Sequence, residues 1–220
     1  MDRSIDQGLA KLQQRLLKMG EYVEQALDLT LRGLMSGSPD SFSQVNSIEH
    51  AVNTLHKEID EAVLVLLAKE SPMAADLRLI LAVFKINSDL ERMADQAVNI
   101  TRHGKDYLSK PPLKPLVDLP RMMDAAREMV RSSLDSFVHR DAELAKQVLE
   151  KDDFLDASKE KIQMELMQFI KQKPESVESA MSLILIARNL ERIGDHATNI
   201  AEDVIFIVTG ADVRHQGKTA

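Results

Sequence analysis

The chain has 220 residues, of which 44% are hydrophobic, and it carries no cysteine and a formal net charge of −7. Without cysteine it has no disulfides, no thiolate zinc site and no thiol catalysis. The negative charge argues against a general electrostatic affinity for nucleic acid or anionic lipid. Only 4% of residues are aromatic and there is no tryptophan. Leu, Ala, Met, Glu and Lys are abundant, which is typical of helical bundles.

The first half of the chain predicts three long helices. The first begins near Ser4, which forms a capping box with Gln7, and ends at Gly37. The second opens at Pro39 and the third at Pro72, because proline suits a first helical turn.

The second half predicts three more helices after a proline-rich linker at 111–115. These helices begin near Pro120, Asp141 and Pro174, and Gly210 ends the last one. Most of the six predicted helices have about 25–35 residues, a length that favours bundles over compact globules.

Apolar residues in the third and sixth helices recur at alternating spacings of three and four, which predicts seams that pack against neighbouring helices. The first seam consists of Leu79, Val83, Ile86, Leu90, Met93, Ala97 and Ile100. The second consists of Leu183, Ile186, Leu190, Ile193, Ala197, Ile200, Val204 and Ile207. No apolar run approaches the roughly 20 residues of a membrane span, and no signal-peptide pattern opens the chain. We therefore expect a cytoplasmic protein.

An internal repeat divides the chain. Residues 90–100 (LERMADQAVNI) and 190–200 (LERIGDHATNI) are identical at their Leu, Glu, Arg, Asp, Ala, Asn and Ile positions. The two halves are therefore one supersecondary unit used twice. The predicted fold is all-α, with two tandem, pseudo-symmetric three-helix bundles. The predicted domains are 1–110 and 116–210, joined by the linker 111–115 and followed by a tail at 211–220.

Packing does not explain why polar residues also recur at fixed offsets. Residues four apart share a helix face, which predicts one row of Glu91, Asp95 and Asn99, extended by Asn87 and His103. A second predicted row contains Glu191, Asp195, Asn199 and Asp203. Both rows are expected on the outer or flanking side of their helices, away from the seams.

Neighbouring carboxylates repel, so each row needs a compensating cation. One candidate is arginine: Arg92 in the first row, and Arg188 and Arg192 in the second. The other candidate is a metal ion, with Asp152 and Asp156 as further ligands from a neighbouring helix. Hard oxygen ligands suit Mg, Mn or Fe. The spacing alone leaves both candidates open.

Signatures of catalysis and of organic cofactors are absent from the sequence: it has no glycine-rich phosphate loop, no Gly-x-Ser-x-Gly and no His-Glu-x-x-His. No histidine follows a glutamate by three positions, unlike in di-iron carboxylate bundles. His196 replaces Gln96 of the other repeat, so we interpret it as a surface or hydrogen-bonded residue. We expect a protein without catalysis.

Three segments resemble the PhoU family of phosphate-uptake regulators across essentially the whole chain. They are 72–78 (PMAADLR), 90–100 and 187–203 (ARNLERIGDHATNIAED), and the C-terminal VTG at 208–210 and VRH at 213–215 agree with them. The resemblance implies two three-helix bundles that often pair as homodimers. It also implies multinuclear metal clusters of Mg, Mn, Fe or Zn at Glu/Asp-x-x-x-Asp motifs. Those motifs are Glu91/Asp95, Glu191/Asp195, Asp152/Asp156 and Glu49/Asn53, the last with Asn in place of the usual Asp.

The resemblance implies negative control of phosphate uptake and of the phosphate-starvation regulon. The implied partners are the ATPase subunit of the phosphate ABC transporter and the phosphate sensor histidine kinase, so the chain meets the membrane only through them. Two alternatives remain: a helical, metal-binding or structural adapter of other function, and a di-iron carboxylate oxidoreductase. The missing Glu-x-x-His pairs argue against the oxidoreductase.

Overall fold

The computed structural model describes residues 4–113, 118–211 and 213, and this part of the chain contains helices and no strand. The first unit consists of α1 (Ser4–Ser36), α2 (Val45–Glu70) and α3 (Ala74–Leu108). The second unit consists of α4 (Asp118–His139), α5 (Ala142–Gln172) and α6 (Val177–Thr209). The predicted all-α fold is confirmed. The predicted domain boundaries stay predictions, and 114–117, 212 and 214–220 lie outside the described residues.

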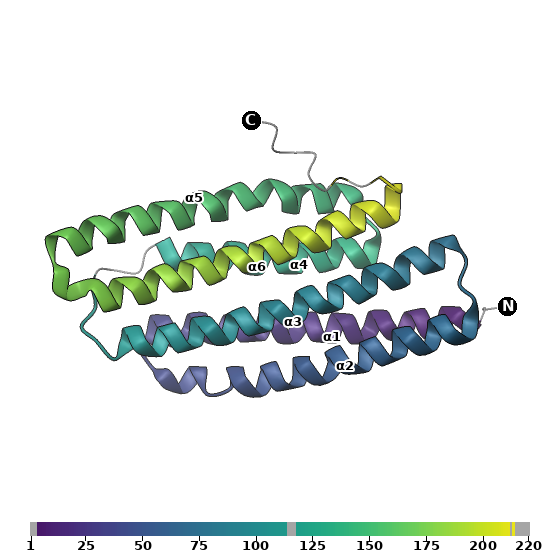
Figure 1. Cartoon of the computed structure of the whole chain (residues 1–220), viewed down its shortest axis with the longest axis horizontal. Coiled ribbons are helices and arrows are strands. Elements are labelled where there is room, and N and C mark those ends of the chain that lie inside the picture. The colour runs from purple at the N-terminus through teal and green to yellow at the C-terminus, as the bar shows by residue number, and fades with distance from the viewer. Residues whose placement is uncertain (1–3, 114–117, 212, 214–220) are drawn as a thin grey trace.

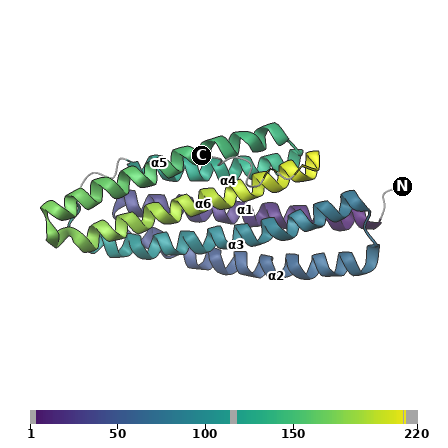
Figure 2. The same cartoon turned by 45° about the horizontal axis from the view of Figure 1, so that its top comes forward.

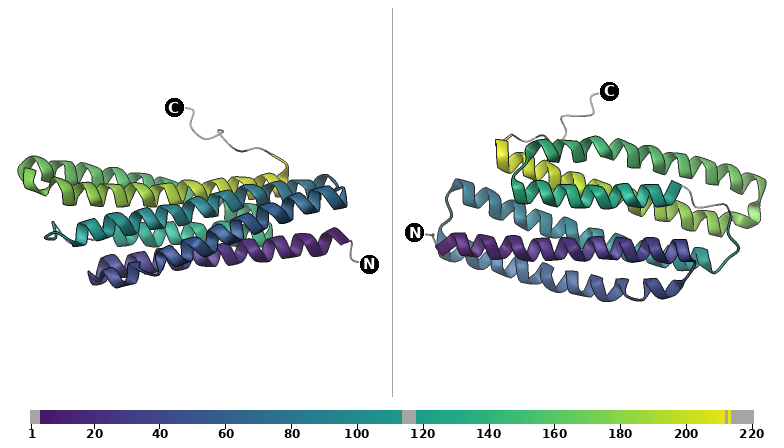
Figure 3. Two further views of the ribbon diagram at one scale, coloured as in Figure 1. Left: turned by 60° about the horizontal axis from the view of Figure 1, so that its bottom comes forward. Right: turned by 180° about the vertical axis from the view of Figure 1, so that it is seen from behind.

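The two units lie side by side and are offset along the long axis of the molecule (Figure 1). Helices α3 and α6 run antiparallel through the middle of the molecule, and α2 and α5 form its outer edges (Figures 1 and 2). From behind, α1 and α4 are adjacent as well (Figure 3). The junction between the units is therefore a four-helix contact of α1, α3, α4 and α6.

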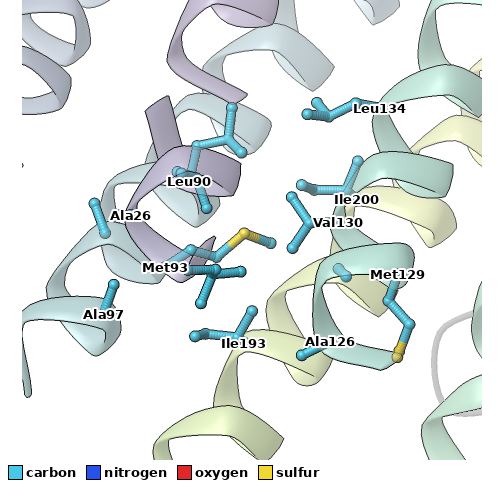
Figure 4. Close-up of a cluster of buried hydrophobic side chains, with 14 of the residues drawn as sticks. Ala26, Leu90, Met93, Ala97, Ala126, Met129, Val130, Leu134, Ile193 and Ile200 are labelled. Carbon is cyan, nitrogen blue, oxygen red and sulfur yellow. The ribbon is translucent and has the colours of Figure 1, made fainter. Parts of the chain in front are cut away.

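Both predicted seams lie in the core. All seven residues of the α3 seam are buried, and so are those of α6 except Ile207, which is partly buried. Figure 4 shows Met93 of α3 and Ile193 of α6 facing each other, with Val130 of α4 beside them. Because one apolar cluster contains residues of all six helices, the two units share a continuous core.

Two helices begin a few residues after Pro39 and Pro174, where the sequence predicted their starts. A 3-10 turn, η1 (Pro39–Phe42), precedes α2, and a second, η2 (Pro174–Ser176), precedes α6. The first turn places Phe42 at the end of the bundle, where it is completely buried. A Cβ atom on Gly33 would lie 2.3 Å from the Phe42 ring, and one on Gly104 would lie 2.9 Å from it. The tight turn and these two glycines together allow the ring to enter the core.

The predicted start of α5 at Asp141 is confirmed. The Asp141 carboxylate accepts hydrogen bonds of 3.0 Å from the backbone N–H groups of Glu143 and Leu144. This cap satisfies donors that an α-helix leaves open at its first turn. Gly210, with φ of 74°, ends α6 as predicted.

Candidate functional site

The carboxylates predicted in the second unit meet between α5 and α6, around a lysine. Lys159 Nζ donates to Glu191 Oε1 at 2.9 Å and lies 3.5 Å from Asp156 Oδ1. Asp156 and Lys159 are three residues apart on α5, and Glu191 and Asp195 are four apart on α6, so each pair shares a helix face. We call Asp156, Lys159, Glu191 and Asp195 the second-unit cluster.

The electrostatics of the second-unit cluster are dominated by its acids. The hydrogen bond from Lys159 to Glu191 raises the pKa of Lys159, with Asp156 adding to the effect. Partial desolvation, and then the nearby Glu191 and Asp156 carboxylates, raise the pKa of Asp195, although Lys159 and His196 oppose the change. One ammonium group therefore does not neutralise the three carboxylates.

Asp152 lies one helical turn before Asp156, beside Gly194 of α6. A Cβ atom on Gly194 would lie 2.4 Å from Leu155 Cδ1 and 3.5 Å from Asp152 Oδ1. The glycine thus lets Leu155 and Asp152 of α5 approach α6 closely. The first unit has Val52 and Ala94 at the corresponding positions, both buried. Leucine faces glycine in the second unit, and valine faces alanine in the first. The total side-chain volume is therefore similar, but it is divided differently between the two helices.

In the first unit the equivalent face has different partners. Asn53 donates to Glu49 within α2, and His50 Nδ1 lies 3.5 Å from Glu49 Oε2. On α3, Glu91 is half-buried and Asp95 is exposed.

His56 stands at the position of Lys159 in the repeat. Its Nε2 lies 3.4 Å from Asp60 Oδ2, and Asn87 of α3 donates to that carboxylate and to the His56 carbonyl. In the first unit, the residue at the position of Lys159 is thus an imidazole, and it belongs to a hydrogen-bonded network with the Asn87 amide.

The predicted row on α6 is split between two neighbours. Glu191 contacts α5, whereas Asn199 donates to Asp89 Oδ1 of α3 at 3.2 Å. Asp203 is buried and pairs with Lys85 of α3 at 2.7 Å. A step of four residues turns an α-helix about 40° beyond a full turn, so three steps rotate the side chain by about 120°. The expected outer position therefore does not hold for Asp203.

A polar contact that the sequence did not predict joins the two units. His196 Nδ1 lies 2.9 Å from Asp89 Oδ1, and both side chains are nearly buried. A carboxylate only accepts hydrogen bonds, so Nδ1 is the donor. The interpretation of His196 as a hydrogen-bonded residue agrees with this contact. The available signal was that Asp89 and His196 both depart from the repeat, which has Asn189 and Gln96 in their places.

The arrangement does not fit a resident metal ion as it stands. Hard carboxylate oxygens are the right kind of ligand, but the Lys159 ammonium group lies among them. Within the described ranges, no group of three or more His, Cys, Asp or Glu side chains is placed to hold a metal. Among the two candidate compensating cations, the contacts favour a basic side chain, although it is lysine and not the expected arginine. Metal binding remains a prediction.

None of the helices in the described part of the chain is long and apolar enough to cross a membrane.

Comparisons with known proteins find matches over most of the chain. The PhoU domain matches twice, over residues 16–103 and 119–204. The phosphate-specific transport system accessory protein PhoU homolog of Pseudomonas putida is 36% identical over 210 residues, covering 95% of this chain and 82% of that protein. The homolog of the same name from Aquifex aeolicus is 36% identical and covers 94% of each chain.

Two crystal structures share the fold. PhoU from Pseudomonas aeruginosa has a TM-score of 0.92 at 32% identity, covering 94% of this chain and 100% of that one. The phosphate transport system regulatory protein PhoU from Streptococcus pneumoniae has a TM-score of 0.87 at 26% identity, covering 96% and 99%.

Proposed function

The chain belongs to the PhoU family, and from this premise we propose that it is a negative regulator of phosphate uptake and of the phosphate-starvation response. The observation that carries the proposal is the match to phosphate-transport accessory proteins over nearly the full length of this chain and 82–94% of theirs. The protein acts at the cytoplasmic side of the membrane by binding other proteins, without catalysing a reaction.

The proposed partners are the ATPase subunit of the phosphate ABC transporter and the phosphate sensor histidine kinase. Occupancy of the transporter favours one arrangement of the three proteins, and this arrangement holds the kinase in its inactive or phosphatase state. A homodimer is the proposed form of the regulator.

Exposed apolar side chains support a function in protein binding. Leu77, Leu81 and Phe84 of α3 are 39%, 48% and 43% exposed. Their spacings of four and three place them on one side of the helix. The equivalent positions of α6, 100 residues later, have Val177 and Met181, which are 43% and 41% exposed. Such apolar surface is typical of interaction sites, and here it recurs in both units.

The first test is alkaline phosphatase activity, as a starvation reporter, in a strain that lacks this gene and grows in abundant phosphate. We expect high activity that the wild-type gene restores to a low level. Low activity in the deletion strain would contradict the regulatory proposal.

A second test asks whether the exposed apolar residues contact the partners. Leu81→Asp and Met181→Asp change exposed side chains, so both variants should fold as the wild type does. We expect each to weaken repression and to reduce co-purification with the kinase or the ATPase. A matched control is Glu58→Gln, an exposed change on α2, which should repress normally. Normal repression by both aspartate variants would contradict a role for this surface.

A further inference from the structure

The second-unit cluster contains its own cation. Lys159 comes from the same helix as Asp156, and its ammonium group reaches across to Glu191 of α6. The Lys159 and Glu191 side chains are 25% and 17% exposed, so the ion pair is screened less than a surface pair. The lysine therefore links α5 to α6 through Glu191.

The charge of the cluster is incompletely balanced. Three carboxylates and one ammonium group leave a net charge of two negative units when all four are ionised. A divalent cation has the charge that would complete the balance, and carboxylate oxygens are its preferred ligands.

Lys159 and a metal ion would compete for the same oxygens. The ammonium group already donates to Glu191 Oε1 and lies beside Asp156 Oδ1. A cation bound to both carboxylates would lie close to the ammonium group, and like charges repel strongly where solvent is partly excluded.

We propose that Lys159 is the resident cation of the second-unit cluster, and that it excludes divalent metal ions from Asp156, Glu191 and Asp195 unless its side chain is withdrawn. The lysine thus replaces a metal as the group that holds α5 against α6 at this face. The inference concerns the cluster itself and does not depend on the proposed regulatory function.

The first unit provides an internal contrast. His56 occupies the position of Lys159, but it pairs with Asp60 and not with the α3 carboxylates. Asn53 occupies the position of Asp156 and donates to Glu49. At the positions of the second-unit cluster this face has one carboxylate fewer, and Asn53 stands next to the basic position, so removal of the basic side chain there should not create an equally acidic site.

The test is isothermal titration of the full chain with Mn²⁺, after dialysis against a chelator. We expect Lys159→Met to bind Mn²⁺ about tenfold or more tightly than the wild type, because an unfavourable like-charge contact is lost. Lys159→Gln should show the same gain and provides a second neutral variant should the methionine variant fold poorly. Lys159→Arg, which keeps the charge, should behave as the wild type does.

Two controls test whether the gain in Mn²⁺ affinity arises at the second-unit cluster. Lys161→Met lies on the same helix, but Lys161 pairs with Asp118 at 3.0 Å, outside the cluster, so its Mn²⁺ affinity should be unchanged. Adding Glu191→Gln to Lys159→Met should remove the gain. Equal affinities in the wild type and both neutral variants would overturn the proposal. A gain that survives Glu191→Gln would overturn it too, because the metal would then bind elsewhere.

Discussion

The two units use the same helical framework, but the carboxylates of their acidic faces have different partners. In the second unit, Lys159 reaches from α5 to Glu191 of α6 and forms a bridge between the helices. In the first unit, Asn53 donates to Glu49 within α2, and His56 pairs with Asp60 of its own helix. The difference shows that a repeated backbone can be maintained while the acidic side chains of each copy find different partners.

The two seams should be energetically equivalent. Leu90 and Leu190 occupy the same position of the repeat, and both are completely buried. We expect Leu90→Ala and Leu190→Ala each to lower the free energy of unfolding by about 2–5 kcal/mol, through lost burial and a residual cavity. Urea unfolding followed by circular dichroism measures both. A loss below about 1 kcal/mol for only one of them would show that the two seams are not equivalent.

The contact between the units should distinguish Asp89 from its counterpart Asn189. Asp89→Ala removes the acceptor of both His196 and Asn199. We expect a loss of about 1–3 kcal/mol, since the nearly buried His196 donor is left without its partner. Asn199 is exposed and can donate to water instead. Asn189→Ala removes a hydrogen bond to the Leu185 carbonyl within α6 and should cost only about 0.5–1.5 kcal/mol. Comparable losses in chemical unfolding would argue against a special role for the Asp89 contact.

Two substitutions should convert the packing of the second unit, at Leu155 and Gly194, into that of the first. Gly194→Ala introduces a methyl group that would overlap Leu155 Cδ1. Overpacking costs about 1–3 kcal/mol, and the better helix propensity of alanine offsets about 0.5–1 kcal/mol of it. We therefore expect a net loss of about 1 kcal/mol.

Adding Leu155→Val reproduces the Val52 and Ala94 combination of the first unit and should restore most of that stability. The double variant is compared with both single variants in urea unfolding. If the double variant is less stable than Gly194→Ala alone, the two pairs of side chains are not interchangeable.

The smallest effect concerns Asp195, whose carboxylate is partly desolvated and lies near those of Glu191 and Asp156. The raised pKa of Asp195 means that the folded state binds this proton more tightly than the unfolded state. Stability therefore falls as pH rises through the ordinary aspartate pKa, near 4, towards the raised value. Asp195→Asn should raise the melting temperature slightly at pH 7, and the gain should disappear as pH falls towards about 4.

The matched variant in the first unit is Asp95→Asn, where Asn53 replaces one neighbouring carboxylate. We expect it to change the melting temperature at pH 7 less than Asp195→Asn does. A gain for Asp195→Asn that persists unchanged down to pH 4 would indicate a cause other than charge.

The helices and the repeat of this protein could be predicted from local patterns in the sequence. Alternating spacings of three and four predicted both seams, because apolar residues at those intervals face one side of a helix. The repeat at 90–100 and 190–200 predicted two copies of one unit, and Asp141 predicted a helix start that the structure confirms. These features depend on the geometry of a single helix, which the sequence determines directly.

The partners of polar residues depended on the tertiary structure. The rotation of α6 directs Glu191 towards α5 but Asn199 and Asp203 towards α3. Lys159 could not be recognised as the cation of Glu191, because the two residues lie on separate helices whose relative position no local pattern specifies. Local patterns in the sequence define the helices, their seams and the repeat. Only the packing of six helices around one shared core decided which charges meet.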